Sequence, residues 1–244
     1  MRTEINERLV KRNRRIAQWL FFVSFGILIG AFFVTNQQAM TPAASTDTLM
    51  LLLSSLVLPL GLVATLVSVR MTNLWIRQPR PEVALREGLK GLSNRSVLYS
   101  YYHAPAQHVL VCPQGVFAIV TRFQDGSFDV NRERWTTRGG PLSGILRVFR
   151  QDSVGRPNYD AERAAAHVQK LLTPVAPGVT VKPLIVFVDP RARFTLHEPL
   201  VPVVYANPKM EPSLKDYLRD LPREGITTLS QDQIKDFEAA TLPG

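Results

Sequence analysis

Two uncharged apolar runs stand near the start of the chain, at residues 16–34 and 49–69. The first has nineteen residues, and at about 1.5 Å per helical residue it covers roughly 28 Å, close to the thickness of a bilayer's hydrocarbon core. Pro59 is tolerated in a membrane helix, because neighbouring helices satisfy the backbone groups that it frees. The pattern predicts transmembrane helices at residues 16–34 and 49–69, joined by a polar loop at residues 35–48.

The first run has one alternative interpretation, a cleaved secretory signal. Basic residues precede it, and the small residues Ala43, Ala44 and Ser45 follow it. The run is longer than the 7 to 15 residues usual for the apolar core of a signal peptide, which favours a retained helix. Gly26 and Gly30 form a GxxxG pair, a spacing that lets two membrane helices approach closely.

Basic residues lie at the outer ends of both runs. Residues 1–15 and residues 70–95 each contain six Lys or Arg against two acidic residues, whereas the loop carries only Asp47. The positive-inside rule therefore predicts a multi-pass protein of the plasma membrane with both termini in the cytoplasm. Residues 96–244 retain a charge of only +2 out of the total of +9, so the high charge mainly indicates contact with the membrane surface.

The chain beyond residue 70 predicts a basic linker at residues 70–80 and a cytoplasmic α/β domain at residues 81–244. Helical patterns cover residues 81–92, 160–172, 212–221 and 231–240, and strand patterns cover residues 108–112, 116–123, 127–130, 179–189 and 201–206. Asp125-Gly126 is a favourable hairpin turn, so the first three strands are expected to form an antiparallel meander. The order of elements predicts a mixed sheet flanked by helices.

Residues that commonly bind metals are sparse and scattered. Cys112 is the single cysteine, which excludes an internal disulfide and is typical of a small buried apolar residue. The four histidines show no metal-ligand spacing: His103, His108, His167 and His197. Asp189 ends an apolar strand pattern, where we expect a cap or turn role. The residues therefore predict neither a metal site nor a cofactor.

Several segments in one order carry a resemblance to a known family. They are HVLVCPQGVFAIVTRF, the turn at Gly126 with Trp135 downstream, a helix after Pro157, and PLIVFVD followed by VPVVYA. Residues 82–221, which contain them, resemble the nuclease-related domain (NERD) family, a relative of the PD-(D/E)XK restriction-endonuclease fold. The resemblance implies a restriction-endonuclease-like domain with a mixed sheet.

The resemblance also implies where a catalytic site would lie. In active members an Asp and a Glu on adjacent strands hold a divalent metal beside a Lys, and these positions fall at Gln107, Val120 and Arg122. Glu82 matches a family carboxylate on the first helix. Valine offers no ligand, an amide oxygen is a weak substitute for a carboxylate, and arginine does not give up its proton at ordinary pH. We therefore expect the hydrolytic site to be lost.

An arginine-rich segment provides a candidate binding surface. Its arginines are Arg132, Arg134, Arg138, Arg147, Arg150 and Arg156, opposed only by Glu133 and Asp152. Such a surface could contact the phosphates of nucleic acid or of lipid headgroups. The alternative is a solvated loop near an anionic membrane.

The sequence thus predicts a membrane-anchored NERD-like protein with a degenerate catalytic motif. It would act as a binding or scaffolding module at the cytoplasmic face of the membrane, with the lipid bilayer and either nucleic acid or a membrane protein as partners. Two alternatives stay open. One is an active membrane-tethered, metal-dependent nuclease that uses displaced carboxylates, and the other is a structural membrane protein with an unrelated α/β domain.

Overall fold

The structure is a computed structural model that describes residues 1–40, 48–138, 153–221 and 228–242. It contains two compact units. One is a helix pair within residues 8–78, and the other combines residues 1–7 with the chain from residue 79 onward. The chain therefore leaves the second unit at residue 7, forms the helix pair, and returns to the same unit at residue 79.

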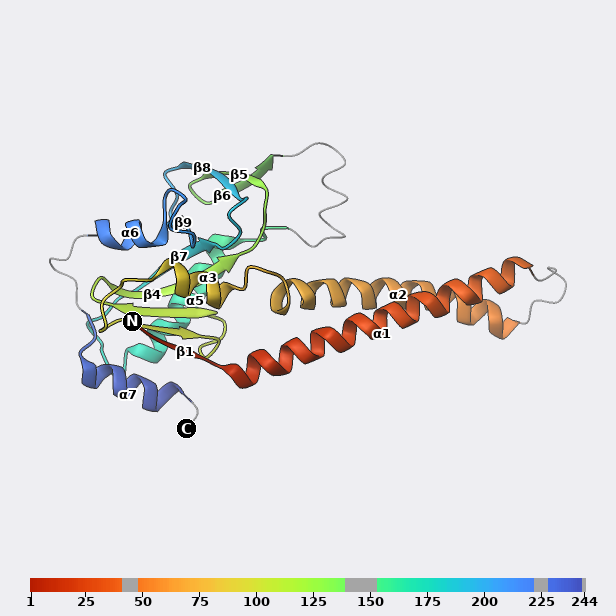
Figure 1. The fold of residues 1–244 in the computed structure, drawn as a ribbon, viewed down its shortest axis with the longest axis horizontal. Coiled ribbons are helices and arrows are strands. Elements are labelled where there is room, and N and C mark those ends of the chain that lie inside the picture. The colour runs from red at the N-terminus through yellow and green to blue at the C-terminus, as the bar shows by residue number, and fades with distance from the viewer. Residues whose placement is uncertain (41–47, 139–152, 222–227, 243–244) are drawn as a thin grey trace. The chain divides into compact units, whose positions relative to one another are not determined.

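The helix pair consists of α1 (Glu7–Met40) and α2 (Thr48–Trp75), which run antiparallel to each other (Figure 1). Both helices are long and apolar enough to cross a membrane. Only 17% and 12% of their most apolar stretches are buried, which is unlike the core helix of a soluble protein. Their exposed large side chains include Trp19, Phe22, Phe32 and Leu60.

Gly61 of α2 faces side chains of α1, and small residues recur among the buried positions of both helices. The buried positions of α1 recur every seven residues: Val10, Ala17, Ser24 and Ala31. In α2 the buried positions Gly61 and Ser68 have the same spacing. A Cβ atom added at Gly61 would lie 3.5 Å from a side-chain atom of Ile27. A seven-residue repeat of mostly small side chains is a pattern that allows two helices to pack closely.

The GxxxG pair does not form this contact. A Cβ atom added at Gly26 or at Gly30 would meet nothing within 4 Å among the described residues. The two glycines lie outside the buried seven-residue repeat that starts at Val10. Their proposed role in packing against another helix stays a prediction.

The main sheet of the second unit has six strands in the order β1-β2-β3-β4-β7-β9. Their bounds are β1 Arg2–Ile5, β2 Val97–Ser100, β3 His108–Cys112, β4 Gly115–Arg122, β7 Val181–Phe187 and β9 Val203–Tyr205. β2, β3 and β4 are antiparallel neighbours, whereas β7 runs parallel to both β4 and β9. The sheet is therefore mixed, as the sequence predicts. No pattern along the chain predicted β1 and β2, which pair in parallel.

A second sheet has the order β6-β5-β8 and contains β5 (Ser127–Asn131), β6 (Arg134–Arg138) and β8 (Arg193–His197). The expected meander of three strands is therefore wrong at its last step, because β5 does not pair with β4. β3 and β7 occupy both edges of β4, which leaves no edge for β5. Asp125-Gly126 instead connects one sheet to the other.

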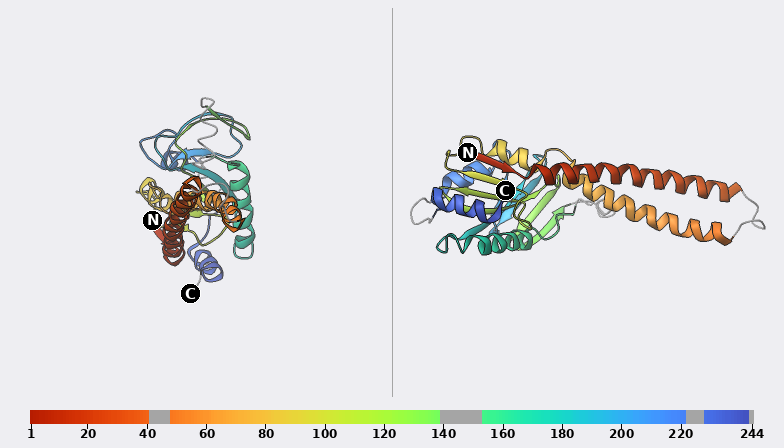
Figure 2. Two further views of the ribbon diagram at one scale, coloured as in Figure 1. Left: turned by 90° about the vertical axis from the view of Figure 1, so that its right-hand side faces the viewer. Right: turned by 90° about the horizontal axis from the view of Figure 1, so that it is seen from below.

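Helices cover both faces of the main sheet (Figures 1 and 2). Leu85 of α3 (Pro81–Gly88) and Leu218 of α6 (Leu214–Asp220) belong to the apolar cluster on one face. Val168 of α5 (Pro157–Leu172) and Phe237 of α7 (Gln231–Thr241) belong to the cluster on the other face. The unit is therefore a mixed sheet between two layers of helices, with the second sheet added at the α5 face.

The helix ends follow the local sequence closely. Pro81 and Pro157 occupy first-turn positions, where a missing N–H costs nothing. Ser230 and Gln233 form the predicted capping box at the start of α7. α3 ends earlier than predicted, at Gly88, where an added Cβ would lie 2.0 Å from the backbone oxygen of Ala206.

Candidate functional site

Glu82 lies in the first turn of α3 and is buried. One carboxylate oxygen accepts hydrogen bonds from the guanidinium of Arg80, with Nε at 2.6 Å. The other accepts a hydrogen bond from the Tyr101 hydroxyl at 2.9 Å. Both oxygens are thus occupied by donors of the protein, and the buried charge is paired.

Tyr101 connects α3 to the turn between β2 and β3. Its φ of 67° lies in the left-handed region, which a side chain with a Cβ rarely adopts. Its backbone N–H donates to the Gln107 carbonyl at 2.7 Å. Burial, followed by the charge of Glu82, raises the pKa of the Tyr101 phenol, so the hydroxyl stays a donor.

Gln107 immediately precedes β3, next to β4 in the sheet. Its side-chain oxygen accepts hydrogen bonds from the Thr121 hydroxyl at 2.9 Å and from the Thr121 N–H at 3.3 Å. The β3–β4 ladder ends at the pair of His108 and Ile119. Beyond this pair, the Gln107 side-chain oxygen accepts the Thr121 N–H of β4 in place of a backbone carbonyl. The oxygen that would replace a family carboxylate is used in the sheet.

Val120 belongs to the apolar core on the face covered by α5, in the same cluster as Ala164. Its neighbour Ile119 belongs to the opposite cluster, with Leu85 of α3. Successive side chains of a strand point to opposite faces of the sheet. Val120 therefore lies on the other face of the sheet from α3 and Glu82.

Arg122 ends β4 and is almost fully buried. Its Nη2 contacts the Asp160 carboxylate of α5 at 2.5 Å, Nε donates to the Val154 carbonyl at 3.1 Å, and Nη1 donates to the Thr121 carbonyl at 3.2 Å. Burial lowers the pKa of Arg122, while Asp160 acts in the opposite direction. The guanidinium thus holds the entry to α5 against the end of β4.

Of the four positions that the resemblance assigns to catalysis, three lie on or beside the neighbouring strands β3 and β4, whereas Glu82 lies on α3. Gln107 lies beside β4, but Val120 and Glu82 are on opposite faces, and Arg122 contacts α5. Across the described residues, no group of three His, Cys, Asp or Glu side chains could hold a metal ion. The partners Tyr101, Thr121 and Asp160 were missed because sequence spacing gives no signal for contacts between distant elements.

The predicted arginine surface is described only in part. Arg132 and Arg134 lie at the turn between β5 and β6, and both are exposed. Neither forms an ion pair with an acidic residue in the described part of the chain. Arg147 and Arg150 lie outside the described residues, as does the side chain of Arg138. Two exposed arginines, with the exposed Glu133 between them in sequence, therefore remain as the described part of this surface.

The outer face of the second sheet continues this surface with polar side chains. Asn131 of β5 pairs with Arg134 on one side and with His197 on the other. Asp129 occupies the middle of the same face and lies 3.8 Å from His197 Nε2. The opposite face of the same strands is apolar, through residues such as Val130. The exposed face thus presents two neighbouring cations beside groups that donate or accept hydrogen bonds.

Two buried histidines are neutral members of the core, as the sequence predicts. His103 Nε2 shares a hydrogen bond with the Thr241 hydroxyl at 3.0 Å, and His108 Nδ1 shares one with the Ser100 hydroxyl at 2.9 Å. Burial lowers the pKa of His103 to about 4 and that of His108 to about 3. Both rings are therefore uncharged at neutral pH.

The remaining candidates have structural roles. The Asp189 carboxylate accepts from the Arg191 N–H at 3.0 Å and from its guanidinium, the expected turn. This hydrogen bond raises the pKa of Arg191. Cys112 is buried, which raises the pKa of its thiol to about 11 and leaves it unreactive at neutral pH.

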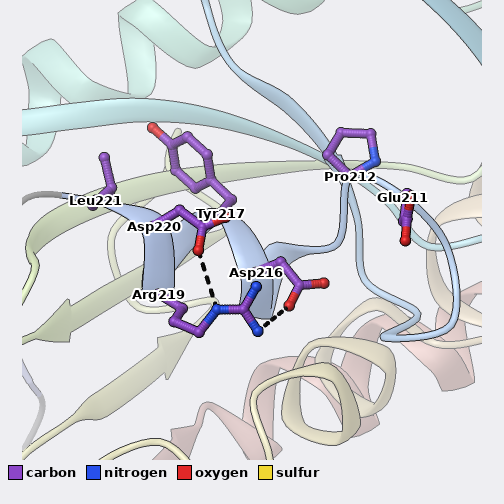
Figure 3. Close-up of a pocket in the computed structure, with 7 residues that line it drawn as sticks. All are labelled: Glu211, Pro212, Asp216, Tyr217, Arg219, Asp220 and Leu221. Atoms are coloured by element: carbon purple, nitrogen blue, oxygen red, sulfur yellow. Dashed lines mark hydrogen bonds and ion pairs between the residues drawn. The ribbon is translucent and has the colours of Figure 1, made fainter.

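An open hollow of about 730 Å³ lies beside α6 (Figure 3). Its lining residues are Glu211, Pro212, Asp216, Tyr217, Arg219, Asp220 and Leu221. The Arg219 guanidinium bridges Asp216 at 2.8 Å and Asp220 at 3.1 Å. No predicted site residue that the structure describes lines this hollow.

The chain was compared with known proteins at three levels. It matches no protein-family model, no curated protein and no solved structure.

Proposed function

We propose that this chain is a membrane-anchored protein whose NERD-like domain has lost hydrolysis and acts as a binding or scaffolding module. The observation that carries the proposal is the use of Glu82, Gln107 and Arg122 in internal contacts of the fold. Glu82 and Arg122 are buried and Gln107 is half-buried, and the Glu82 carboxylate, the Gln107 amide oxygen and the Arg122 guanidinium all contact protein partners. Such groups stabilise the fold but offer no ligands to a metal.

The order of elements supports the resemblance to the PD-(D/E)XK fold. α3, the strands β2 to β4, α5 and β7 follow one another along the chain, over the residues that carry the resemblance. Gln107 and Arg122 lie on or beside adjacent strands, as the family's metal-binding residues do. The family assignment is part of the proposal.

The pairing of β1 with β2 supports the proposed topology. Residues 2–5 and residues 97–100 belong to one sheet, and the two apolar helices lie between them along the chain. A chain that crosses a bilayer twice returns to its starting side, so the sheet can form only if both helices cross or neither does. Their apolar exposed surfaces favour crossing, and the flanking basic residues favour cytoplasmic ends in the plasma membrane.

Arg132 and Arg134 are the proposed contact for a phosphate-bearing partner on the cytoplasmic side. They are exposed and carry no ion pair with a described acidic side chain, and guanidiniums bind phosphate through paired hydrogen bonds. Nucleic acid is the partner that we test, because phosphate contacts make its binding strongly dependent on salt. A membrane protein partner would leave nucleic-acid binding absent while the lack of cleavage persists.

The test uses the full chain purified in detergent, with labelled single-stranded and duplex DNA and RNA. We expect no cleavage with Mg²⁺ or Mn²⁺, and salt-sensitive binding that the double variant R132Q/R134Q weakens. The variant R95Q/R163Q removes the same charge from exposed sites elsewhere in the domain and should bind normally. Divalent-dependent cleavage that Glu82→Gln abolishes would overturn the proposal in favour of an active nuclease with displaced carboxylates.

A further inference from the structure

The first turns of α1 carry a stripe of arginines on one face. Arg8, Arg12 and Arg15 are spaced by four and three residues and are all exposed. At 100° per residue they fall within about 60° of one another around the helix. The buried residues Val10 and Ala17 lie about 180° away from this stripe, so the arginines face away from the contact with α2.

No described acidic side chain neutralises this stripe. None of Arg8, Arg12 and Arg15 forms an ion pair with an acidic residue among those that the structure describes. Like charges three and four residues apart destabilise a helix, so the stripe carries an electrostatic cost. An anionic partner outside the chain would offset that cost.

The position of the stripe along α1 indicates which partner it meets. Arg15 directly precedes Ile16, the first residue of the uncharged run, and Arg12 lies about 4.5 Å further out than Arg15 along the helix axis. The polar headgroup layer of a bilayer is about 5–7 Å thick on each side, so both guanidiniums lie at its depth. Trp19 is 65% exposed and continues the same face into the apolar run, where aromatic side chains mark the membrane interface.

The corresponding end of α2 differs. Arg70 is exposed there, but Arg77 interacts with a neighbouring group and Arg80 pairs with Glu82. The concentrated charge therefore belongs to α1 rather than to the helix pair as a whole.

We propose that Arg8, Arg12 and Arg15 form a binding surface for anionic phospholipid headgroups. Guanidiniums bind phosphate oxygens through paired hydrogen bonds, and a lipid bound here places its acyl chains beside Trp19. The inference rests on the proposed insertion of α1 into the membrane. It adds a lipid preference and a defined contact surface to that proposal.

Trp19 provides a direct measure of the lipid beside the stripe. The full chain with Trp75 and Trp135 replaced by Phe is reconstituted into phosphatidylcholine bilayers that contain a brominated lipid, which quenches a neighbouring tryptophan. We expect brominated phosphatidylglycerol to bind beside Trp19 at least fivefold more strongly than brominated phosphatidylcholine, because one cation near an anionic surface contributes about fivefold. Equal quenching by both lipids would overturn the proposal.

Matched variants assign the preference to the stripe. Arg15→Gln should lower the preference for phosphatidylglycerol about fivefold, and R8Q/R12Q/R15Q should abolish it. Arg14→Gln removes the same charge at the same depth, but Arg14 lies about 130° from the centre of the stripe, so this variant should keep the preference. Equal losses for Arg14→Gln and Arg15→Gln would overturn the proposed surface. If α1 were not inserted, neither brominated lipid would quench Trp19, which separates failure of the membrane proposal from failure of this one.

Discussion

The helix pair exposes its large apolar side chains, whereas the mixed-sheet unit buries them. In the helix pair Phe22 and Phe32 are 65% and 67% exposed, while the small residues Ser24 and Gly61 are buried. In the mixed-sheet unit Phe117 and Phe187 are almost fully buried. The difference is consistent with the proposed lipid environment of the helix pair, because lipid tails solvate phenylalanine as well as a protein core does.

The same difference separates the forces that hold each unit together. Removal of apolar surface from water stabilises the mixed-sheet unit. In the proposed bilayer the helix pair would gain little from that effect and would depend on close packing of small side chains. A change of conditions or of side-chain size should therefore affect one unit and leave the other nearly unchanged.

Acidification should separate the two units most strongly. All four histidines lie in the mixed-sheet unit, and burial holds the pKa of His103 at about 4 and of His108 at about 3. The unfolded chain takes up these protons as the pH falls below about 6.5, whereas the folded unit does not. At pH 5 we expect a loss of about 2 kcal/mol per histidine, or about 4 kcal/mol in all, measured by denaturant unfolding of the full chain that Trp135 fluorescence reports.

The variant H103F/H108F is the control for acidification. It removes both titrating rings, so the stability of the mixed-sheet unit should become much less dependent on pH between 7 and 5. An unchanged pH dependence in this variant would show that other groups cause the acid sensitivity.

Replacement of Arg122 should have the next largest effect, again on the mixed-sheet unit alone. Arg122→Ala removes three hydrogen bonds of a buried side chain, at an expected cost of about 2 to 3 kcal/mol, although the half-exposed Asp160 carboxylate stays hydrated. The exposed Arg163 on the same helix as Asp160 provides the control, and Arg163→Ala should change stability by less than about 0.5 kcal/mol. Equal stability of the two variants would show that the contacts of Arg122 with α5 do not stabilise the mixed-sheet unit.

Replacement of a small buried residue by a large one should destabilise the helix pair and leave the mixed-sheet unit unchanged. Gly61→Leu places a large side chain against Ile27 and Leu28 of α1, and we expect overpacking to cost about 2 kcal/mol. Gly30→Leu adds the same side chain where an added Cβ meets nothing within 4 Å, and it should be nearly neutral. The rate of disulfide cross-linking between α1 and α2 in bilayers measures the effect of each variant. A larger effect of Gly30→Leu than of Gly61→Leu would contradict the contact between Gly61 and α1.

The smallest predicted effect concerns the connection of β1 to the sheet. The N–H groups of Arg2 and Asn6 donate to the carbonyls of Ser96 and Ser100 at 2.9 and 3.1 Å, and the alternation of the ladder directs the Glu4 N–H to the same partner strand. Glu4→Pro should therefore cost about 1 kcal/mol. Thr3→Pro removes an N–H that points away from β2 and should cost less. Hydrogen exchange of the β2 amides measures both effects, and we expect faster exchange in Glu4→Pro than in Thr3→Pro.

Patterns along the chain were sufficient to predict most single elements. The two apolar helices, the capping box at Ser230 and the buried strand β7 follow from local composition and spacing, although β7 ends at Phe187 rather than at the predicted Asp189. Each of these depends on neighbours a few residues away. The mixed sheet followed because strands and helices alternate along the chain.

Partners distant in sequence could not be predicted in this way. β1 is a four-residue strand in a basic segment, and its partner lies beyond both apolar helices, so no local pattern marks it. The prediction of a hairpin at Asp125-Gly126 was wrong because β7 pairs with the edge of β4 that β5 would have needed. The site positions were identified by resemblance, but the contacts of Arg122 with Asp160 and of Gln107 with Thr121 depend on tertiary packing.

The most direct test of the central claim is the side of the membrane on which each end of the helix pair lies. Single cysteines at position 7, at position 45 in the predicted loop and at position 95 are introduced in a chain with Cys112→Ala, and intact cells are treated with a membrane-impermeant maleimide. Two crossings with cytoplasmic ends predict labelling at position 45 alone, and labelling at positions 7 and 95 only after permeabilisation. Labelling of positions 7 and 95 from opposite sides, or of either one in intact cells, would contradict the account.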